Sequence, residues 1–155
     1  MSLLPEQTLR DALIATELQS FSVAVERSQL RFFAVAIGEQ AGVYVDVDAA
    51  HAANHPDLVV PPTFFFSLEL QRPDPYAALR TAGARLSQIL HAQQSFEYHR
   101  LAFAGDELHL APRVTDYREK KGGALAFLTR TTTVSRAGES VAELVNVVAI
   151  RRSAA

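Results

Sequence analysis

The strongest constraint on the fold is a short helix that has almost no polar side. Pro61-Pro62 fixes the backbone for a helix start, and residues 63–70 (TFFFSLEL) are apolar on nearly every face. Such a helix should be buried all round, so other elements have to enclose it. It ends before Arg72-Pro73-Asp74-Pro75, where the prolines prevent its continuation.

Four long strands are expected after this helix, because apolar residues recur there with the two-residue period of a half-buried strand or in continuous runs. The strands cover residues 89–98, the segment around 108–114, 125–134 and 141–150. Turn signals occur at Lys121-Gly122-Gly123 and at Ala137-Gly138. One buried helix followed by a meander of antiparallel strands predicts an α+β fold with a curved sheet wrapped around the helix.

The first part of the chain adds short elements to this plan. Residues 5–17 form a weakly amphipathic helix, and residues 21–25 alternate as a strand, which gives a sheet of about five strands. Residues 30–37 have helical spacing and end at Gly38, and residues 49–54 form another short helix. A length of 155 residues predicts a single domain over 1–155, with its core in about 20–152.

Charge and residue types exclude several classes of partner. The net charge of −2 and the scattered arginines give no basic block for nucleic acid or anionic lipid. Neither a membrane span nor a signal peptide is evident, so we expect a cytoplasmic protein with no nucleic-acid or membrane partner. The chain has no cysteine, and His51 and His55 lack a third ligand motif. We therefore expect no metal and no cofactor.

Several segments together resemble a known family. Residues 31–64 (RFFAVAIGEQAGVYVDVDAAHAANHPDLVVPPTF) are similar to the N-terminal hot-dog half of MaoC-like (R)-specific enoyl thioester hydratases and dehydratases. In that family a strand resembling residues 94–100 (QSFEYHR) leads into a segment resembling Ala104-Gly105-Asp106. The resemblance extends over about 20–152 and implies a hot-dog fold, a dimer, and an acyl-CoA or acyl carrier protein thioester of fatty acid metabolism as the ligand.

The resemblance fails at the motif that carries the chemistry. Competent members of the superfamily contain G-D-x-N-P-(L/I/V)-H, whose Asp and His flank an activated water. The matching residues 38–44 are GEQAGVY, so Glu39 replaces the Asp and Tyr44 replaces the His. An unperturbed tyrosine, with a pKa of about 10, is a poor base at neutral pH. We therefore assign no catalytic residue to this chain.

The resemblance also implies where a substrate would bind. Families of this kind use backbone N–H groups at the amino end of the buried helix to stabilise enolate-like charge on the thioester oxygen. Pro61 and Pro62 have no N–H, which leaves Thr63 and Phe64 as donors. The candidate substrate-binding residues are Glu39, Tyr44, Thr63, Phe64 and His99.

These observations predict a hot-dog subunit of an (R)-specific 3-hydroxyacyl thioester dehydratase or enoyl-CoA hydratase, a lyase. The chain would contribute acyl-chain binding and dimer support, and would be inactive alone. It would form a homodimer or a heterodimer with a subunit that carries G-D-x-N-P-(L/I/V)-H. Two alternatives stay open: a self-sufficient homodimeric acyl-CoA thioesterase or hydratase that uses Glu39 with Tyr44, or Asp46, and a non-catalytic structural or regulatory binding subunit.

Overall fold

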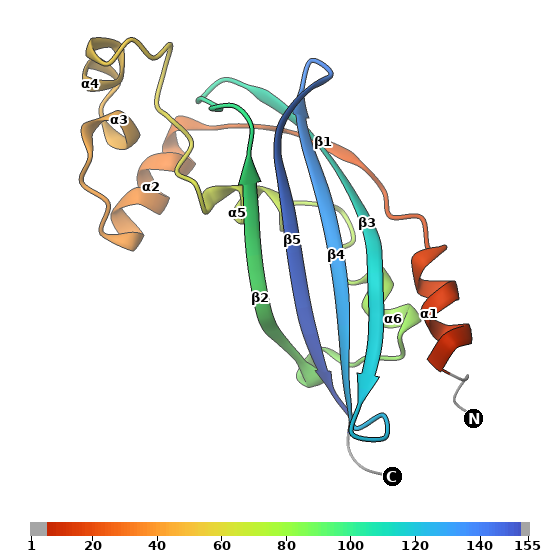
Figure 1. The fold of residues 1–155 in the computed structure, drawn as a ribbon. Coiled ribbons are helices and arrows are strands. Elements are labelled where there is room, and N and C mark those ends of the chain that lie inside the picture. The colour runs from red at the N-terminus through yellow and green to blue at the C-terminus, as the bar shows by residue number, and fades with distance from the viewer. Residues whose placement is uncertain (1–5, 153–155) are drawn as a thin grey trace.

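The computed structural model describes residues 6–152 and is built on one antiparallel sheet. The strands are β1 (Phe21–Ala24), β2 (Ile89–Tyr98), β3 (Glu107–Lys120), β4 (Leu125–Arg136) and β5 (Glu139–Arg151). Their spatial order is β1-β3-β4-β5-β2 (Figure 1). The predicted α+β class and the five-stranded sheet are therefore confirmed.

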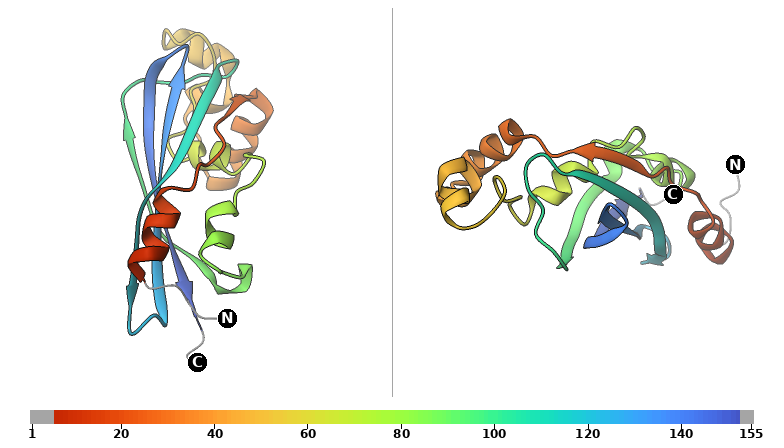
Figure 2. Two further views of the ribbon diagram at one scale, coloured as in Figure 1. Left: turned by 90° about the vertical axis from the view of Figure 1, so that its right-hand side faces the viewer. Right: turned by 90° about the horizontal axis from the view of Figure 1, so that it is seen from above.

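The helices lie mainly on one side of this sheet. They are α1 (Glu6–Ile14), α2 (Arg27–Ile37), α3 (Gly42–Val45), α4 (Val47–Ala52), α5 (Phe64–Glu69) and α6 (Ala77–Thr81), with a 3₁₀ turn at Leu86–Gln88. Figure 2 shows that the sheet curves around α5 and that α6 continues the same layer. The short helices α3 and α6 were not predicted, because four or five residues carry too little periodicity to reveal a helix.

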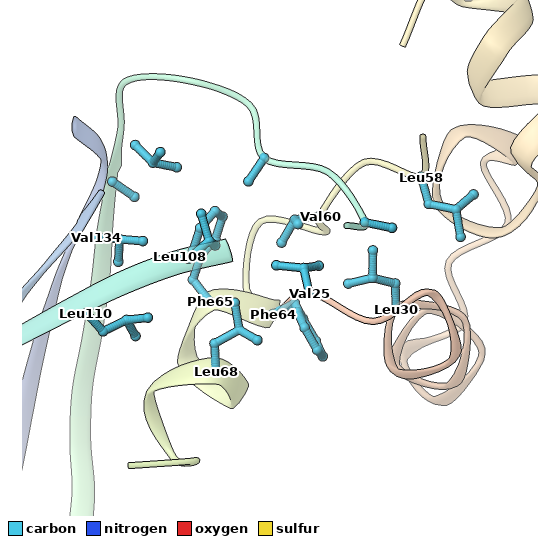
Figure 3. Packing of buried hydrophobic residues seen from close by; sticks show 14 of the residues in the cluster. Val25, Leu30, Leu58, Val60, Phe64, Phe65, Leu68, Leu108, Leu110 and Val134 are labelled. Carbon is cyan, nitrogen blue, oxygen red and sulfur yellow. The ribbon is translucent and has the colours of Figure 1, made fainter. Parts of the chain in front are cut away.

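The main core forms where α5 meets the concave face of the sheet. Phe64, Phe65 and Leu68 are buried in one cluster (Figure 3). Its members from the sheet include Leu108, Leu110 and Val134, and α2 contributes Leu30. The ring of Phe64 also meets that of Phe33 edge to face, with 5.2 Å between centroids.

The prediction that the 63–70 helix is buried all round is only partly right. Phe66 and Ser67 are half-buried, and Leu70 at the C-cap is 53% exposed. The reason is that the sheet and α2 cover part of the helix circumference and leave the rest open. The apolar residues on the open part are free to line a cavity or an interface.

The strand order also differs from a simple four-stranded meander. Only β3, β4 and β5 follow one another as neighbours, and β2 crosses to the far edge, where it pairs with β5. The connecting segment 99–106 is held against the segment before α5, since the N–H of Val60 donates to the Ala102 carbonyl and that of Ala104 to the Leu58 carbonyl, both at 2.9 Å. Within residues 6–152, nothing pairs with the outer edge of β2.

The helices α3 and α4 pack very closely at a glycine. A Cβ atom added to Gly42 would lie 2.7 Å from the Cβ of Ala49, which is closer than real side chains approach. Gly42 therefore permits the close packing of α3 against α4.

Removing the Leu68 side chain should strongly destabilise the protein, because this residue is fully buried in the main core. We expect Leu68→Ala to lower the free energy of unfolding by about 2–5 kcal/mol, measured by urea denaturation. The matched control is Leu70→Ala at the end of the same helix, which should cost only about 0.5 kcal/mol. Equal losses in the two variants would contradict the packing described.

A side chain at Gly42 should also destabilise the fold. Replacing a helical glycine by alanine ordinarily stabilises a protein by about 0.5–1 kcal/mol. Here the contact with Ala49 should reverse the sign, and Gly42→Ala should cost about 1–3 kcal/mol. Adding Ala49→Gly should recover most of that loss in a double-mutant cycle of unfolding free energies. A gain in stability from Gly42→Ala alone would disprove the close approach.

Candidate functional site

A cleft of about 360 Å³ opens at the amino end of α5, next to the end of β2. Its lining consists of Tyr44, Val59, Val60, Pro62, Phe65, Tyr98, His99, Arg100, Leu101 and Ala102. Two of the candidate residues, Tyr44 and His99, are brought together here although they are distant in the sequence. The lining is mostly apolar and contains no carboxylate.

Tyr44 reaches the cleft because the chain turns sharply after α2. Gly38 adopts the left-handed conformation, with φ of 76°, and its N–H donates to the carbonyl of Val35. The chain then enters α3, and the N–H of Val59 donates to the carbonyl of Val43 at 3.0 Å. This bond holds α3 beside the segment that leads to α5 and leaves Tyr44 half-buried in the cleft wall.

Glu39 has a local role in the same turn. Its Oε1 accepts the backbone N–H groups of Gln40 at 2.9 Å and Ala41 at 2.8 Å. Asp46, the other carboxylate considered as a base, accepts the N–H of Asp48 at 2.9 Å and caps α4. Both carboxylates satisfy backbone donors, and neither lines the cleft.

Thr63 and Phe64 are adjacent in sequence but are not brought into this lining. Thr63 is the exposed N-cap of α5, and its side chain makes no capping bond. The N–H of Phe64 already donates to the carbonyl of Pro61 at 2.9 Å. The Phe64 ring lines a separate cavity of about 390 Å³ between α2 and α5, together with Phe32 and Phe33.

Tyr98 is a cleft residue that sequence reasoning missed. Its hydroxyl donates to the carbonyl of Pro62 at 2.9 Å, and its ring stacks on Phe96 with centroids 5.8 Å apart. Burial raises the pKa of Tyr98 above its ordinary value, so the phenol stays protonated at neutral pH. The available signal was the two-residue spacing of Phe96 and Tyr98, which puts both aromatic rings on one face of β2.

Positive charge lies at the edge of the cleft. Arg100 donates from Nη1 to the carbonyl of Ser140 at 2.9 Å, and its Nε lies 3.4 Å from the carboxylate of Glu139. The adjacent His99 is exposed, and its backbone N–H donates to the carbonyl of Val141. The arrangement can therefore hold an apolar chain against Phe65 and Val60, with phenol, imidazole and guanidinium groups around its polar end.

Neither a metal site nor a membrane helix is found in the part of the chain described. Residues 6–152 contain no group of three or more potential ligands that could hold a metal ion. His51 lies 3.2 Å from the carbonyl of Pro56, whereas His55 packs on the Phe103 ring. Over the same residues, no helix has the length and apolar character needed to cross a membrane.

The sequence matches a protein family and several curated relatives. The family model of the FAS1-like dehydratase domain region matches residues 12–144. A UPF0336 protein of Saccharopolyspora erythraea is 36% identical over 105 residues, covering 68% of this chain and 66% of the relative. The UPF0336 protein SCO4636 of Streptomyces coelicolor is 32% identical over 117 residues, covering 76% of this chain and 77% of the relative.

Solved structures share the fold. A chain of the ChsH1-ChsH2 complex from Mycobacterium tuberculosis superposes with a TM-score of 0.76 at 20% identity, with 96% of each chain covered. A MaoC-like dehydratase gives a TM-score of 0.75 at 25% identity, covering 91% of this chain and 44% of the other. These likenesses confirm the predicted hot-dog fold, and the chain belongs to the family of FAS1-like, MaoC-like dehydratase domains.

Proposed function

We propose that this chain is a single-domain subunit of an (R)-specific enoyl thioester hydratase or 3-hydroxyacyl thioester dehydratase. It holds the acyl part of the substrate in the cleft at Tyr44 and His99, and a partner subunit supplies the catalytic Asp and His. One observation carries the proposal. The cleft has the apolar lining of a ligand site, yet it contains no carboxylate, and Glu39 is bonded to its own backbone.

The reaction shows why this composition is insufficient alone. Adding water across the α,β double bond requires a group that takes a proton from water, a proton donor for the α carbon, and stabilisation of negative charge on the thioester oxygen. Tyr44 and Tyr98 are phenols and poor bases at neutral pH. The N–H of Phe64 is already bonded to Pro61 and is not free for an oxyanion. A second subunit with an intact motif would provide the missing groups.

The proposed ligand is a thioester of coenzyme A or acyl carrier protein, used in cytoplasmic fatty acid metabolism. Val60 and Phe65 give an apolar surface for an acyl chain. Arg100, whose side chain is half exposed at the cleft edge, can meet a phosphate of either carrier. The hydroxyl of Tyr98 donates a hydrogen bond to the carbonyl of Pro62, so Tyr98 shapes the cleft wall and does not react.

The outer edge of β2 is the surface proposed for the partner. This long strand has exposed apolar side chains, with Leu90 50% exposed and Tyr98 45% exposed. Unprotected apolar edges favour pairing with another strand. The neighbouring structures include two complexes, ChsH1-ChsH2 and HadBC, the second a 3R-hydroxyacyl-ACP dehydratase. We favour a heterodimer with a G-D-x-N-P-(L/I/V)-H subunit over a homodimer.

The assembly should be visible in solution. Sedimentation at micromolar concentration should show a dimer of this chain or a complex with its partner, and Leu90→Lys should raise the dissociation constant about tenfold or more. The control Thr133→Lys places the same charge at an exposed position of β4 and should leave the dissociation constant unchanged. A stable monomer that does not bind the partner subunit would contradict the proposal.

The purified chain alone should turn over crotonyl-CoA and longer enoyl-CoA poorly. We expect a rate about a hundredfold to ten-thousandfold below that of the reconstituted complex, because one positioned acid-base group contributes about that much. In the complex, Glu39→Gln should leave the chemical step unchanged.

Two outcomes would disprove this assignment. One is turnover of several per second by the chain alone that Tyr44→Phe or Glu39→Gln abolishes. The other is unaided acyl-CoA hydrolysis that Glu39→Ala or Asp46→Ala abolishes, which would identify a thioesterase.

A further inference from the structure

A further cavity, of about 220 Å³, lies at the opposite end of α5 from the cleft. It is enclosed by the carboxyl end of α5, the α6 segment and the first part of β2, and we call it the arginine cavity. Its apolar walls include Phe66, Leu70, Leu79, Leu86, Ile89 and Val148. Its polar groups include Arg72, His91, Arg130 and Asn146.

Arg72 is the unusual group in this cavity. Its residue is only 7% exposed, and Nη2 donates to the carbonyl of Pro75. Nε and Nη1 are buried and have no hydrogen-bond partner in the structure. Burial lowers the pKa of Arg72 to about 10, so it still carries a positive charge at neutral pH. A buried cation with two unused donors is costly unless an acceptor reaches it.

Neither nearby carboxylate accepts a hydrogen bond from Nε or Nη1 of Arg72. Glu69 is 1% exposed, and its Oε1 accepts from Nε of Arg130 at 2.7 Å and from Oγ1 of Thr132 at 2.5 Å. Asp74 accepts from the exposed Arg80 at 3.0 Å. One buried carboxylate therefore faces two guanidinium groups, and the cavity retains about one uncompensated positive charge.

We propose that the arginine cavity binds a small molecule with one carboxylate group and a short apolar tail. The carboxylate accepts a hydrogen bond from one of the two unused donors of Arg72, Nε or Nη1, which lie on different sides of the guanidinium, and the tail lies against Phe66, Leu79 and Val148. A singly charged group matches the single excess charge, and the apolar walls suit a hydrocarbon more than a hydrated phosphate. The site goes beyond the proposed function, because it requires no thioester and is separated from the cleft by the length of α5.

The competing arrangement has no ligand. The Oε2 atom of Glu69 is also buried without a partner, so water could join it to Arg72 and make the cluster purely structural. The two arrangements differ in what the protein binds. Only a ligand site discriminates a carboxylate from a neutral molecule of the same shape.

The test is calorimetric titration of the full chain with butyrate, hexanoate and octanoate, beside methyl hexanoate, hexan-1-ol and inorganic phosphate. We expect saturable binding of at least one carboxylate, and much weaker binding of the neutral molecules and of phosphate. Arg72→Gln should weaken carboxylate binding about tenfold or more. The control Arg113→Gln changes an exposed arginine of β3 and should leave binding unchanged.

A second measurement covers the case in which Arg72→Gln does not fold. In the wild-type protein, the ¹⁵N-detected Nε–H signal of the buried Arg72 should shift on addition of hexanoate, and those of exposed arginines should not. Failure of every carboxylate to bind, equal binding of the methyl ester, or preferred binding of phosphate would overturn the proposal. Thioester turnover by the reconstituted complex is measured separately, so failure here leaves the proposed function intact.

Discussion

The rest of the structure depends on the burial of one face of α5. Phe64, Phe65 and Leu68 leave water only because the curved sheet covers them and α2 closes over Phe64. The helix has six residues and is about 9 Å long, whereas β3 has fourteen residues and spans about 46 Å. So short a helix leaves the concave face open beyond each of its ends. The cleft at Tyr44 lies at one end and the arginine cavity at the other.

Two residues that depart from the family's catalytic motif, Glu39 and Gly42, serve the local packing of the chain. Glu39 bonds two N–H groups of its own turn, and Gly42 permits α3 to approach Ala49 more closely than a larger residue, such as the family's proline, would allow. At the helix start, the carbonyl of Pro61 accepts the hydrogen bond from the N–H of Phe64. Restoring Asp and His alone would therefore leave the surrounding backbone arranged for packing. This is consistent with a subunit that depends on a partner for its chemistry.

A helix or strand could be predicted where the residue pattern within its own segment indicates it, but contacts between distant segments could not. The strands β2 to β5 could be predicted from alternation or apolar runs, and the helix α5 from its Pro-Pro start and its apolar faces. The edge position of β2, by contrast, depends on hydrogen bonds between segment 99–106 and segment 58–60. The sequence named Tyr44 and His99 as candidates, whereas the spacing of Phe96 and Tyr98 indicated only that the two rings share a face of β2 and not that Tyr98 would join the cleft. Arg72 was interpreted only as part of a helix stop, because the cavity around it also contains Arg130, Asn146 and Val148, which are distant in the sequence. Glu69, a carboxylate within an apolar helix, was the one local hint of the arginine cavity.

The most direct test of the central claim is a crystal structure of this chain with a G-D-x-N-P-(L/I/V)-H subunit and an unreactive enoyl thioester analogue. We expect the thioester carbonyl and the double bond to contact the Asp and His of the partner. The acyl chain should lie against Val60 and Phe65 of this chain, and Glu39 should keep its bonds to Gln40 and Ala41. A thioester held between the carboxylate of Glu39 and the hydroxyl of Tyr44, with no contact to the partner's motif, would contradict the account.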